Sequence, residues 1–563
     1  MSDVFDKASH LYAERQRLHG IAQENAADIE LLHTENRELR AEIELLRHER
    51  EYYRAAFESI SNARWWKLTA PLRRMTEQLR RLFHPRKPVP LSGRVWPETD
   101  REETVRRRTK DTDARKTFGI VSQNRSEALK RSLEAQTYPA WQWGSEGSDY
   151  TLLLSTDCEL HPYALSVLAE TLESHELVYG DELFEADGKE QTLFRFAFSP
   201  YSLRSSCDLG TVLAVRSALF ASLPTDCGGI DRLLLLCDAA ESAAHIPAVL
   251  CRRAGAAMPV ATEEGCEALQ RHLQRHGLSG TVTPTEDGCY YHVAYEIVGA
   301  PMVSIVIPNW EHLVDISVCL DSIYQRSTYP NFEIILVRNG QESEEISAYY
   351  AAAEKGRRNL RMVSYTGEFN YSAVCNAGVK AAKGEYVLLL NNDVEVITPA
   401  WIEEMLMLAQ QQDVGIVGAK LLYPNETVQH CGMAFTSPKT IEHLFRGASA
   451  LDPGPLGFLC TMQEVTAVTG ACVLLRRSLY ETLGGLDEGY AVYFSDVDLC
   501  MKTREAGYRI LCTPFSCLYH MEGSSCGTAE TPEKEQQFLR DSDRFFARWG
   551  KWSKKGDLFV NLK

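Results

Sequence analysis

Residues 386–395 read YVLLLNNDVE, a short apolar run that ends in two acids, Asp393 and Glu395. A run of tyrosine, valine and three leucines is typical of a strand that is buried on both faces, as in a parallel sheet. In open α/β sheets ligands bind beyond the carboxyl ends of the strands, and this is where the two acids emerge. Carboxylates at that edge favour a metal ion with an anionic substrate bound to it.

The composition is that of a globular protein with several domains. The chain has 563 residues, of which 44% are apolar and 24% charged, and its length predicts roughly three or four units of about 150 residues. The net charge of -17 argues against a general nucleic-acid binder, so we expect no nucleic-acid partner.

The cysteines and the amino terminus indicate a cytoplasmic protein. Sixteen cysteines are scattered singly without a CxxC pair, which favours reduced packing residues over a disulfide framework or a zinc site. The first ten residues, MSDVFDKASH, hold no apolar signal region. No stretch reaches the roughly 18 apolar residues that a membrane span needs.

Residues 1–60 are predicted to contain a coiled coil. From residue 11 to residue 53 a heptad repeat places leucine at most d positions and isoleucine at two a positions, Ile29 and Ile43. This combination favours a parallel dimer, and the polar Asn36 at another a position would fix the register. A single long solvated helix is the alternative.

Residues 61–100 are predicted to form a basic amphipathic neck and a linker. Between residues 64 and 94 nine basic side chains accompany a single acid, Glu77, and the apolar residues of 72–82 have helical spacing. Such a helix binds an anionic membrane surface, or it docks on the body of the protein with its basic face in water. Four prolines between residues 85 and 97 mark the linker.

The rest of the chain contains one pattern twice. YPAWQW at 138 resembles YPNFEI at 329, DYTLLLSTDCEL at 149 resembles EYVLLLNNDVEV at 385, and HIPAVLCRR at 245 resembles LCTPFSCLYH at 511. Strands and helices alternate in both copies, which predicts two α/β domains with largely parallel sheets. We place these domains at residues 101–298 and 299–563.

The first copy is shorter by about 45 residues, because the offset between the copies grows between the YP pairs and the triple leucines. The missing part corresponds to the strand IILV and the segment FNYSAVCNAG of the second copy. The first copy keeps Asp157 and Glu159 after its leucines but has GGIDRLLLL where the second has YFSDVDLCM. We therefore expect the domain at 101–298 to be truncated and inactive.

Four features of the second copy are predicted to meet at one edge of its sheet. VSIVIPNWEH and IILVRNG supply two strands, YVLLLNNDVEV brings the acids, and AVYFSDVDLCM places Asp496 and Asp498 where a strand gives way to a helix. His520 follows in CLYHMEG. Each feature alone is common, since an acidic pair before a helix is often a cap, but their order and spacing together indicate one site.

These segments resemble the family 2 glycosyltransferases of GT-A fold, particularly bacterial enzymes that build O-antigen, capsule or rhamnose-rich polysaccharides. The matching motifs run from about residue 303 to residue 527 and include VSIVIP, FNYSAVCNAG, AAKGEYVLLLNND, VQHCGMAF, TGACVLLRR and GGLDEGYAVYFSDVDLC. The neck segment SISNARWWKLTAPLR is similar to the element that follows coiled coils in such proteins. The resemblance implies an α/β protein with two GT-A domains, of nucleotide-diphospho-sugar transferase type, behind a coiled coil.

The resemblance also implies a metal site. Asp393 ends Asn391-Asn392-Asp393, which is this chain's version of the family's DxD motif and has Asn391 where the first acid is usual. Asp393 would bind Mn2+ or Mg2+ together with the diphosphate of the donor, and Glu395 and His520 would complete the metal shell.

A catalytic base is implied as well. Asp496 matches the family's base, which takes the proton of the acceptor hydroxyl as that hydroxyl attacks the anomeric carbon in an inverting displacement. Asp498 is the competing candidate, and Ser495 replaces the acid that commonly precedes the base. Alternatively, both acids are structural or cap a helix.

Donor contacts are expected from the loops that follow the strands. Arg338 stands where the family usually has an acid that contacts the nucleoside, so it pairs with a phosphate or faces solvent. Trp310 either lies beside the base or is a packed aromatic residue. The residues expected to bind the donor are Pro308, Asn309, Trp310, Asn339, Asn376, Asn391 and Asn392.

The sequence thus predicts a metal-dependent, inverting glycosyltransferase. It would move a sugar from a nucleotide diphosphate sugar, such as dTDP-rhamnose or a UDP-hexose, to a lipid-linked polysaccharide acceptor. We expect a homodimer that the neck holds on the cytoplasmic face of the inner membrane. The alternative is a noncatalytic scaffold or chain-length regulator with inert GT-A domains, which Asn391, Arg338 and Ser495 favour.

Overall fold

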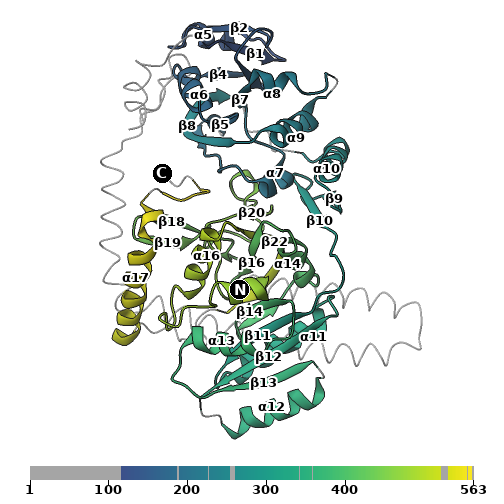
Figure 1. Cartoon of the computed structure of the whole chain (residues 1–563), viewed down its shortest axis with the longest axis vertical. Helices are drawn as coiled ribbons and strands as arrows, with labels where there is room; N and C mark the ends of the chain where they lie inside the picture. Colours follow the sequence, from purple (N-terminus) through teal and green to yellow (C-terminus); the bar gives the residue numbers. More distant parts are fainter. Residues whose placement is uncertain are drawn as a thin grey trace, which may run out of the picture. The chain divides into compact units, whose positions relative to one another are not determined.

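The computed structural model describes residues 116–186, 189–225, 227–253, 260–340, 343–357, 359–521, 531–554 and 556–560. The predicted coiled coil and basic neck lie outside these residues. Both α/β domains belong to one compact unit, Glu98–Tyr423 with Thr427–Lys563 (Figure 1). Within the described ranges, no disulfide joins the cysteines, and no helix combines the length and apolar character that crossing a membrane requires.

The second domain is built on a ten-stranded sheet with the order β13-β12-β11-β14-β21-β16-β22-β15, to which β17 and β20 add at the side. The strands are β11 (Val303–Asn309), β12 (Phe332–Asn339), β13 (Leu360–Tyr365), β14 (Tyr386–Leu390), β15 (Val394–Val396), β16 (Val414–Leu422), β17 (Val428–His430), β20 (Gln463–Glu464), β21 (Cys472–Arg476) and β22 (Arg509–His520). A separate hairpin consists of β18 (Met433–Ser437) and β19 (Thr440–His443).

This sheet is mixed, which differs from the largely parallel sheet that we expected. Strands β11, β12, β13 and β14 run parallel to one another, but β21 runs antiparallel to both of its neighbours, β14 and β16. The chain between β16 and β21 passes through short strands rather than a single crossover helix, so it can return in the opposite direction.

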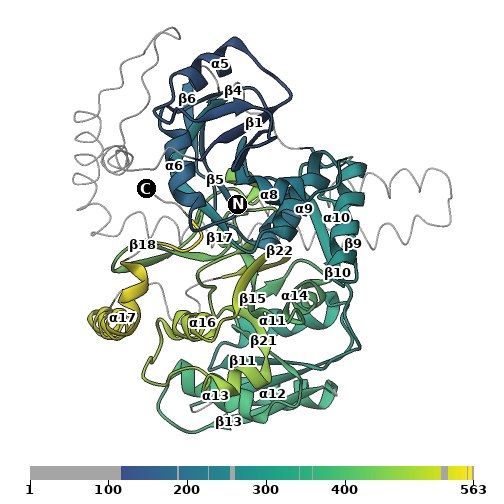
Figure 2. The ribbon, with the colours of Figure 1, turned by 45° about the horizontal axis from the view of Figure 1, so that its top comes forward.

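Helices cover both faces of the sheet. They are α11 (Leu313–Arg326), α12 (Glu344–Gly356), α13 (Tyr371–Ala381), α14 (Trp401–Ala409), α15 (Arg477–Thr482), α16 (Ser495–Glu505) and α17 (Pro532–Ser553). All five residues of β14 are buried, as predicted. Leu388 and Leu390 pack in the core with α11 and α14, whereas Val387 and Leu389 pack in the core with α13 and α16. Figures 1 and 2 accordingly show α14 and α16 on opposite sides of the sheet.

The first domain repeats this arrangement, which confirms the repeat seen in the sequence. Its order β2-β1-β3-β7-β5-β8-β4 places equivalent strands side by side, with β6 paired to β5. The strands are β1 (Phe118–Ser122), β2 (Trp141–Trp143), β3 (Tyr150–Leu154), β4 (Cys158–Leu160), β5 (Leu177–Ala186), β6 (Lys189–Leu193), β7 (Val212–Arg216) and β8 (Ala243–Arg253). The helices are α5 (Glu127–Glu134), α6 (Ala164–Leu172), α7 (Pro200–Ser206), α8 (Ser217–Ala221), α9 (Gly229–Ala239) and α10 (Glu263–Arg275).

The truncation of the first domain lies where the sequence indicated. Trp141–Trp143 pairs with β1 as residues 332–334 pair with β11, so β2 matches only the beginning of β12, and IILV after its first residue has no counterpart. The segment between β2 and β3 has no counterpart of α12, β13 and α13. The first domain therefore lacks the helix that carries FNYSAVCNAG.

A short hairpin follows the last strand of the first sheet and precedes the first strand of the second sheet in the sequence. It consists of β9 (Gly280–Pro284) and β10 (Tyr291–Tyr295). On β10, His292 contacts Glu404 of α14, with 3.1 Å between Nε2 and Oε2. Tyr201 of α7 donates a hydrogen bond of 2.6 Å to Asp413, which precedes β16. The two α/β domains are thus joined by polar contacts as well as by the chain.

Candidate functional site

A cavity of about 480 Å³ lies where three parallel strands end. Strands β11, β12 and β14 contribute the residues that follow their carboxyl ends, and the starts of β21 and α16 close the other side. The lining residues are Pro308, Asn309, Trp310, His312, Asn339, Phe369, Tyr371, Val374, Asn391, Asn392, Thr469, Gly470, Ala471, Val492, Tyr493, Ser495, Asp496, Lys534 and Gln537. Of the expected donor-binding residues, all but Asn376 line this cavity.

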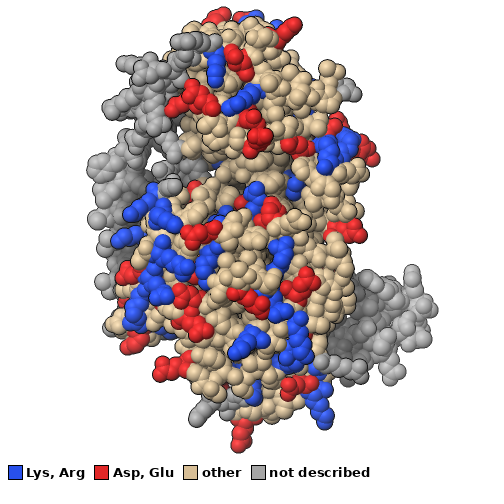
Figure 3. Space-filling model, in the orientation of Figure 1, with Lys and Arg blue, Asp and Glu red and all other residues tan. Residues whose placement is uncertain are grey.

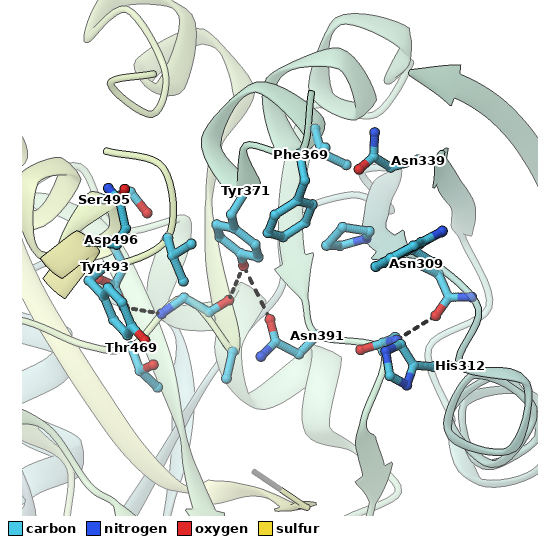
Figure 4. Close-up of a pocket in the computed structure, with 18 of the residues that line it drawn as sticks. Asn309, His312, Asn339, Phe369, Tyr371, Asn391, Thr469, Tyr493, Ser495 and Asp496 are labelled. Carbon is cyan, nitrogen blue, oxygen red and sulfur yellow. Dashed lines mark hydrogen bonds between the residues drawn. The ribbon is translucent and has the colours of Figure 1, made fainter. Parts of the chain in front are cut away.

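Figure 4 shows how the polar groups are distributed along the cavity. Asp496 and Tyr493 lie at one end, and Asn309 and Asn339 lie at the other, with Tyr371 and Asn391 between them. The cavity therefore lies between the candidate base and the ends of β11 and β12, where Asn309 and Asn339 are found. Such an arrangement leaves room for a ligand that reaches both ends.

Two asparagines hold the strand-end loops together. The Asn392 amide donates a hydrogen bond to Asn309 Oδ1, and Asn309 Nδ2 donates to Tyr350 Oη over 2.5 Å. Both asparagines are almost fully buried. Their side chains thus fix the relative positions of the loops after β11 and β14.

The rim at the strand-end side is aromatic. Trp310 and Phe369 are both about half exposed, at 51% and 52%. Trp310 lies over Gly340, where an added Cβ would be 2.8 Å from its Nε1, so this position needs a glycine. Arg338 is not among the lining residues, and its Nη2 donates to Ser364 of β13 over 2.7 Å.

Asp496 projects into the cavity from the first turn of α16. The preceding residue, Phe494, has a left-handed backbone with φ 65° and stacks on Phe545 of α17. The Asp496 carboxylate accepts a hydrogen bond of 2.8 Å from the Gly470 amide. The first turn of a helix is a favourable place for an acid, and the Gly470 amide fixes the position of this one.

Asp498 lies elsewhere, which differs from its expected place as a competing base. Its side chain is fully buried and accepts hydrogen bonds from Trp549 Nε1 at 2.8 Å and Arg548 at 3.1 Å. Lys502 lies 3.3 Å away on the same helix. Asp498 therefore ties α16 to α17, and Asp496 is the acid that faces the cavity.

Trp549→Phe is expected to destabilise the domain by about 1–3 kcal/mol, because it removes a donor from a buried carboxylate. The apparent melting temperature should fall, as measured by circular dichroism. Trp552→Phe on the same helix is the matched control, since Trp552 is only partly buried against the core. An unchanged melting temperature for Trp549→Phe would show that the bond to Asp498 does not stabilise the fold.

The residues expected to hold a metal are partly brought together. Asp393 Oδ1 lies 3.1 Å from His520 Nε2, and Asn391 Nδ2 lies 3.2 Å from the same nitrogen. This contact follows from the sheet, in which Val394 of β15 pairs with His520 of β22. The motif and the distant histidine thus meet next to the cavity.

Glu395 and Asn376 lie away from this corner. Glu395 forms an ion pair of 2.8 Å with Arg326 at the end of α11, because it lies on the opposite face of β15 from Val394, which pairs with His520. The Asn376 amide accepts from Tyr480 Oη at 2.5 Å and donates to the Leu486 carbonyl at 2.9 Å. The structure therefore places Glu395 in a surface ion pair and Asn376 under the loop that precedes α16.

Tyr371 connects the two ends of the cavity. Its hydroxyl lies 3.2 Å from Asn391 Oδ1 and 3.3 Å from the Gly470 carbonyl, and the Gly470 amide bonds Asp496. Burial, with the nearby Cys375 and Asp496, holds the pKa of Tyr371 well above its usual range. The hydroxyl therefore remains a neutral donor at physiological pH.

A second group of side chains of the kinds that bind metal ions lies in the first domain. Asp238, His272 and His276 bring their ligand atoms within 4.8 Å of one another. Arg275 also contacts Asp238 at 3.0 Å, and the bonds from His272, His276 and Arg275 outweigh burial and lower the pKa of Asp238 to about 2. An arginine already neutralises this carboxylate, so the group is an ion-pair cluster rather than a cation site.

The first domain carries a different residue where the second carries His520. Arg253 pairs with Cys158 of β4 as His520 pairs with Val394 of β15. Its Nε lies 2.9 Å from Glu182, while Asp157, which corresponds to Asp393, accepts from Ser126 at 2.6 Å. The first domain thus has an arginine in place of the histidine, which supports the expectation that it is inactive.

Several cavity residues were not identified from the sequence. Lys534 and Gln537 come from α17, where no motif marks them. His312, Thr469 and Tyr493 lie in loops within the motifs VSIVIPNWEH, TGACVLLRR and GGLDEGYAVYFSDVDLC, but nothing in the sequence marks them there as site residues. Tyr371 could have been found, because it lies in the motif FNYSAVCNAG directly after Asn370, which caps α13. Gln429, which contacts His520 at 2.6 Å, lies within the motif VQHCGMAF.

Charges are interspersed on the face of the molecule that Figure 3 shows, where Lys and Arg alternate with Asp and Glu. Among the described residues, charged side chains at the surface also form pairs, such as Arg544 with Asp487 at 2.9 Å and Lys551 with Glu505 at 3.1 Å. Pairs of this kind at the surface contribute little to stability.

The part of the chain that carries most of the cavity is similar to known proteins. Residues 304–484 match the family model of glycosyl transferase family 2. This match lies within the second domain, and it agrees with the family that the motifs of this domain resemble.

Two relatives cover much of the chain. The O-antigen biosynthesis protein RfbC of Myxococcus xanthus is 32% identical over 78% of this chain and 36% of its own length. The uncharacterized protein y4gI of Sinorhizobium fredii is 40% identical over 52% of this chain and 32% of its own length. The chain thus spans about a third of the length of these two proteins.

Two further comparisons are more distant. The N-acetylglucosaminyl-diphospho-decaprenol L-rhamnosyltransferase of Mycobacterium tuberculosis is 25% identical over 31% of this chain and 61% of its own length. Among solved structures, GalNAc-T7 with UDP, GalNAc and Mn2+ aligns with a TM-score of 0.40 and 13% identity, over 53% of this chain and 59% of that one.

Proposed function

We propose that this protein transfers a sugar, with inversion, from a nucleotide diphosphate sugar to a polysaccharide acceptor. The observation that carries the proposal is a single cavity with Asp496 at one end and the asparagines of the strand ends at the other. A metal corner adjoins it, where Asp393 and His520 lie 3.1 Å apart beside Asn391.

The residues of this corner fit a divalent cation. A carboxylate oxygen and an imidazole nitrogen are both ligands for Mn2+, and both side chains are buried, with Asn391 of the cavity lining 3.2 Å from the imidazole. When bound, Mn2+ or Mg2+ would act as a Lewis acid that stabilises the charge on the departing diphosphate. Asp393 and His520 would hold it, and Glu395 would not.

Asp496 would act as the general base. Its carboxylate is oriented by the Gly470 amide at 2.8 Å, which leaves the carboxylate facing the cavity. The acceptor hydroxyl would give its proton to Asp496 while its oxygen forms the bond to the anomeric carbon and the bond to the diphosphate breaks. Lys534 and Gln537 of α17 border the same cavity and would contact the acceptor.

The relatives support a cell-surface glycan as the product. RfbC is an O-antigen biosynthesis protein, and the mycobacterial relative is a rhamnosyltransferase that acts on a lipid diphosphate. We therefore favour dTDP-rhamnose or a UDP-hexose as donor and a lipid-linked glycan as acceptor. Dimerisation by the coiled coil and attachment of the neck to the cytoplasmic face of the inner membrane remain part of this proposal.

A thermal-shift panel of nucleotides and nucleotide sugars tests the function. One nucleotide class is expected to raise the melting temperature only with Mn2+, since a ligand at 100 times its Kd adds about 2.7 kcal/mol to the stability of the native state. The measurement compares UDP, GDP and dTDP and their sugars, each with Mn2+ and with EDTA. If no nucleotide shifts the melting temperature, the noncatalytic scaffold becomes the better assignment.

A further inference from the structure

We propose that Gln429 is a positioning residue that sets the tautomer of His520 and so makes this histidine a ligand for a divalent cation. The inference rests on the proposed metal role of Asp393 and His520. It adds the residue that prepares the ring before any cation binds. Gln429 lies on β17, which pairs with β16 beside β22.

The two ends of the Gln429 amide contact the same histidine. Its Nε2 donates to the main-chain carbonyl of His520 over 3.3 Å, and its Oε1 lies 2.6 Å from His520 Nδ1. A carbonyl only accepts hydrogen bonds, so the amide nitrogen must face it and the amide oxygen must face the ring. Because an amide oxygen also only accepts, the proton of the ring resides on Nδ1.

The other ring nitrogen is thereby left with its lone pair. In a neutral imidazole one nitrogen carries the proton and the other accepts, so Nε2 of His520 presents a lone pair to Asp393 Oδ1 at 3.1 Å. Asn391 Nδ2 donates to the same lone pair over 3.2 Å, so Nε2 accepts a hydrogen bond there, and a cation that displaces this amide would find a nitrogen and a carboxylate oxygen side by side. A histidine that ligates metal through one nitrogen and donates a proton from the other has this arrangement.

The histidine of the first-domain cluster shows the opposite arrangement. His272 Nε2 accepts a hydrogen bond of 3.0 Å from Arg204, so its Nδ1 carries the proton and donates to Asp238 at 2.8 Å. That histidine and carboxylate satisfy each other without a cation. In both histidines Nδ1 carries the proton. In His272 this N–H faces the carboxylate, because an arginine occupies Nε2, whereas in His520 the N–H faces an amide oxygen and Nε2 faces the carboxylate.

The repeat within the chain supports the link between Gln429 and His520. In the first domain Leu193 and Thr192 pair with successive residues of β5, whereas on β17 the pairing passes from His430 to Val428. Gln429 is therefore an extra residue at a bulge, and the first domain has no counterpart of it. The domain that has Arg253 in place of the histidine thus also lacks the glutamine. The glutamine is present where there is a ring to orient.

Mn2+ titrations of the full chain test the proposal, with free Mn2+ measured by its electron paramagnetic resonance signal in the presence of UDP, GDP or dTDP. Gln429→Leu is expected to weaken Mn2+ binding about 10–100-fold, the usual effect of removing such a partner. Gln429→Glu should recover much of the affinity, because a carboxylate also accepts from Nδ1. Gln463→Leu is the matched control, since Gln463 is as buried as Gln429 and lies on β20.

The outcomes separate this inference from the proposed function. If wild type binds Mn2+ with a nucleotide and Gln429→Leu binds it equally well, the role of Gln429 is overturned and the proposed function stands. If wild type binds no Mn2+ with any of the nucleotides, the metal role in the proposed function fails, and this inference fails with it.

A second measurement applies even where the leucine variant fails to fold. Nitrogen-15 spectra of wild-type protein labelled at histidine report the tautomer directly, and the signal that disappears in His520→Asn belongs to His520. A proton on Nδ1 is expected. A proton on Nε2 of the neutral ring would overturn the proposal.

Discussion

Asp496→Asn is expected to lower kcat about 10²–10⁴-fold, the usual contribution of a general base, with little change in the affinity for the donor. Asparagine keeps the size of the side chain and can still accept the bond from the Gly470 amide, which is 2.8 Å long in the wild type. It does not take the proton of the acceptor hydroxyl. Initial rates of nucleotide release, with donor binding measured by calorimetry, give both quantities.

Asp498→Asn is the matched control, because it makes the same chemical change two residues further along. Its buried carboxylate bonds Trp549 at 2.8 Å, so this variant should lower the melting temperature while the folded protein keeps its turnover. Full turnover in Asp496→Asn, or a selective loss of turnover in Asp498→Asn, would reverse the assignment of the two acids.

Asp393→Asn is expected to reduce activity by about 10³-fold or more, since Lewis-acid stabilisation is worth several kcal/mol and each 1.4 kcal/mol is a factor of ten in rate. The variant should also require more Mn2+ for half-maximal rate, because an amide oxygen replaces a charged ligand. Activity as a function of Mn2+ concentration measures both effects. Removing metal with EDTA should abolish the activity of the wild type.

Glu395→Gln separates the roles of the two acids in the opening motif. Glu395 forms an ion pair with Arg326 at 2.8 Å on the other face of β15, so its loss should leave the Mn2+ dependence unchanged. A change in the Mn2+ requirement of Glu395→Gln, with none in Asp393→Asn, would contradict the metal corner described above.

The sequence predicted the fold from local patterns. The apolar run of β14 and the repeated segments were sufficient, because a strand that is buried on both faces and followed by acids has a distinct composition. The antiparallel course of β21 was not predicted, since strand direction depends on how the preceding excursion packs and not on the residues of the strand.

The site was predicted in part, and the geometry of the elements explains the rest. Asp496 and Asp498 are two positions apart on α16, and side chains at positions i and i+2 of a helix point in nearly opposite directions. Glu395 follows Asp393 by two residues, but Glu395 lies within β15, whereas Asp393 precedes this strand. Lys534 and Gln537 reach the cavity from α17 through tertiary packing, which no local pattern encodes.

Gly470 and Ala471, the two residues before β21, serve both halves of the chemistry. The Gly470 main-chain amide orients Asp496, and the Ala471 carbonyl accepts a hydrogen bond of 3.0 Å from the main-chain N–H of Asn391. A shift of this dipeptide would therefore disturb the base and the metal corner together, so the effects of substitutions at the two ends should not be additive when this segment also changes. A substitution engineered at this dipeptide should therefore alter the proposed donor and acceptor geometry at once.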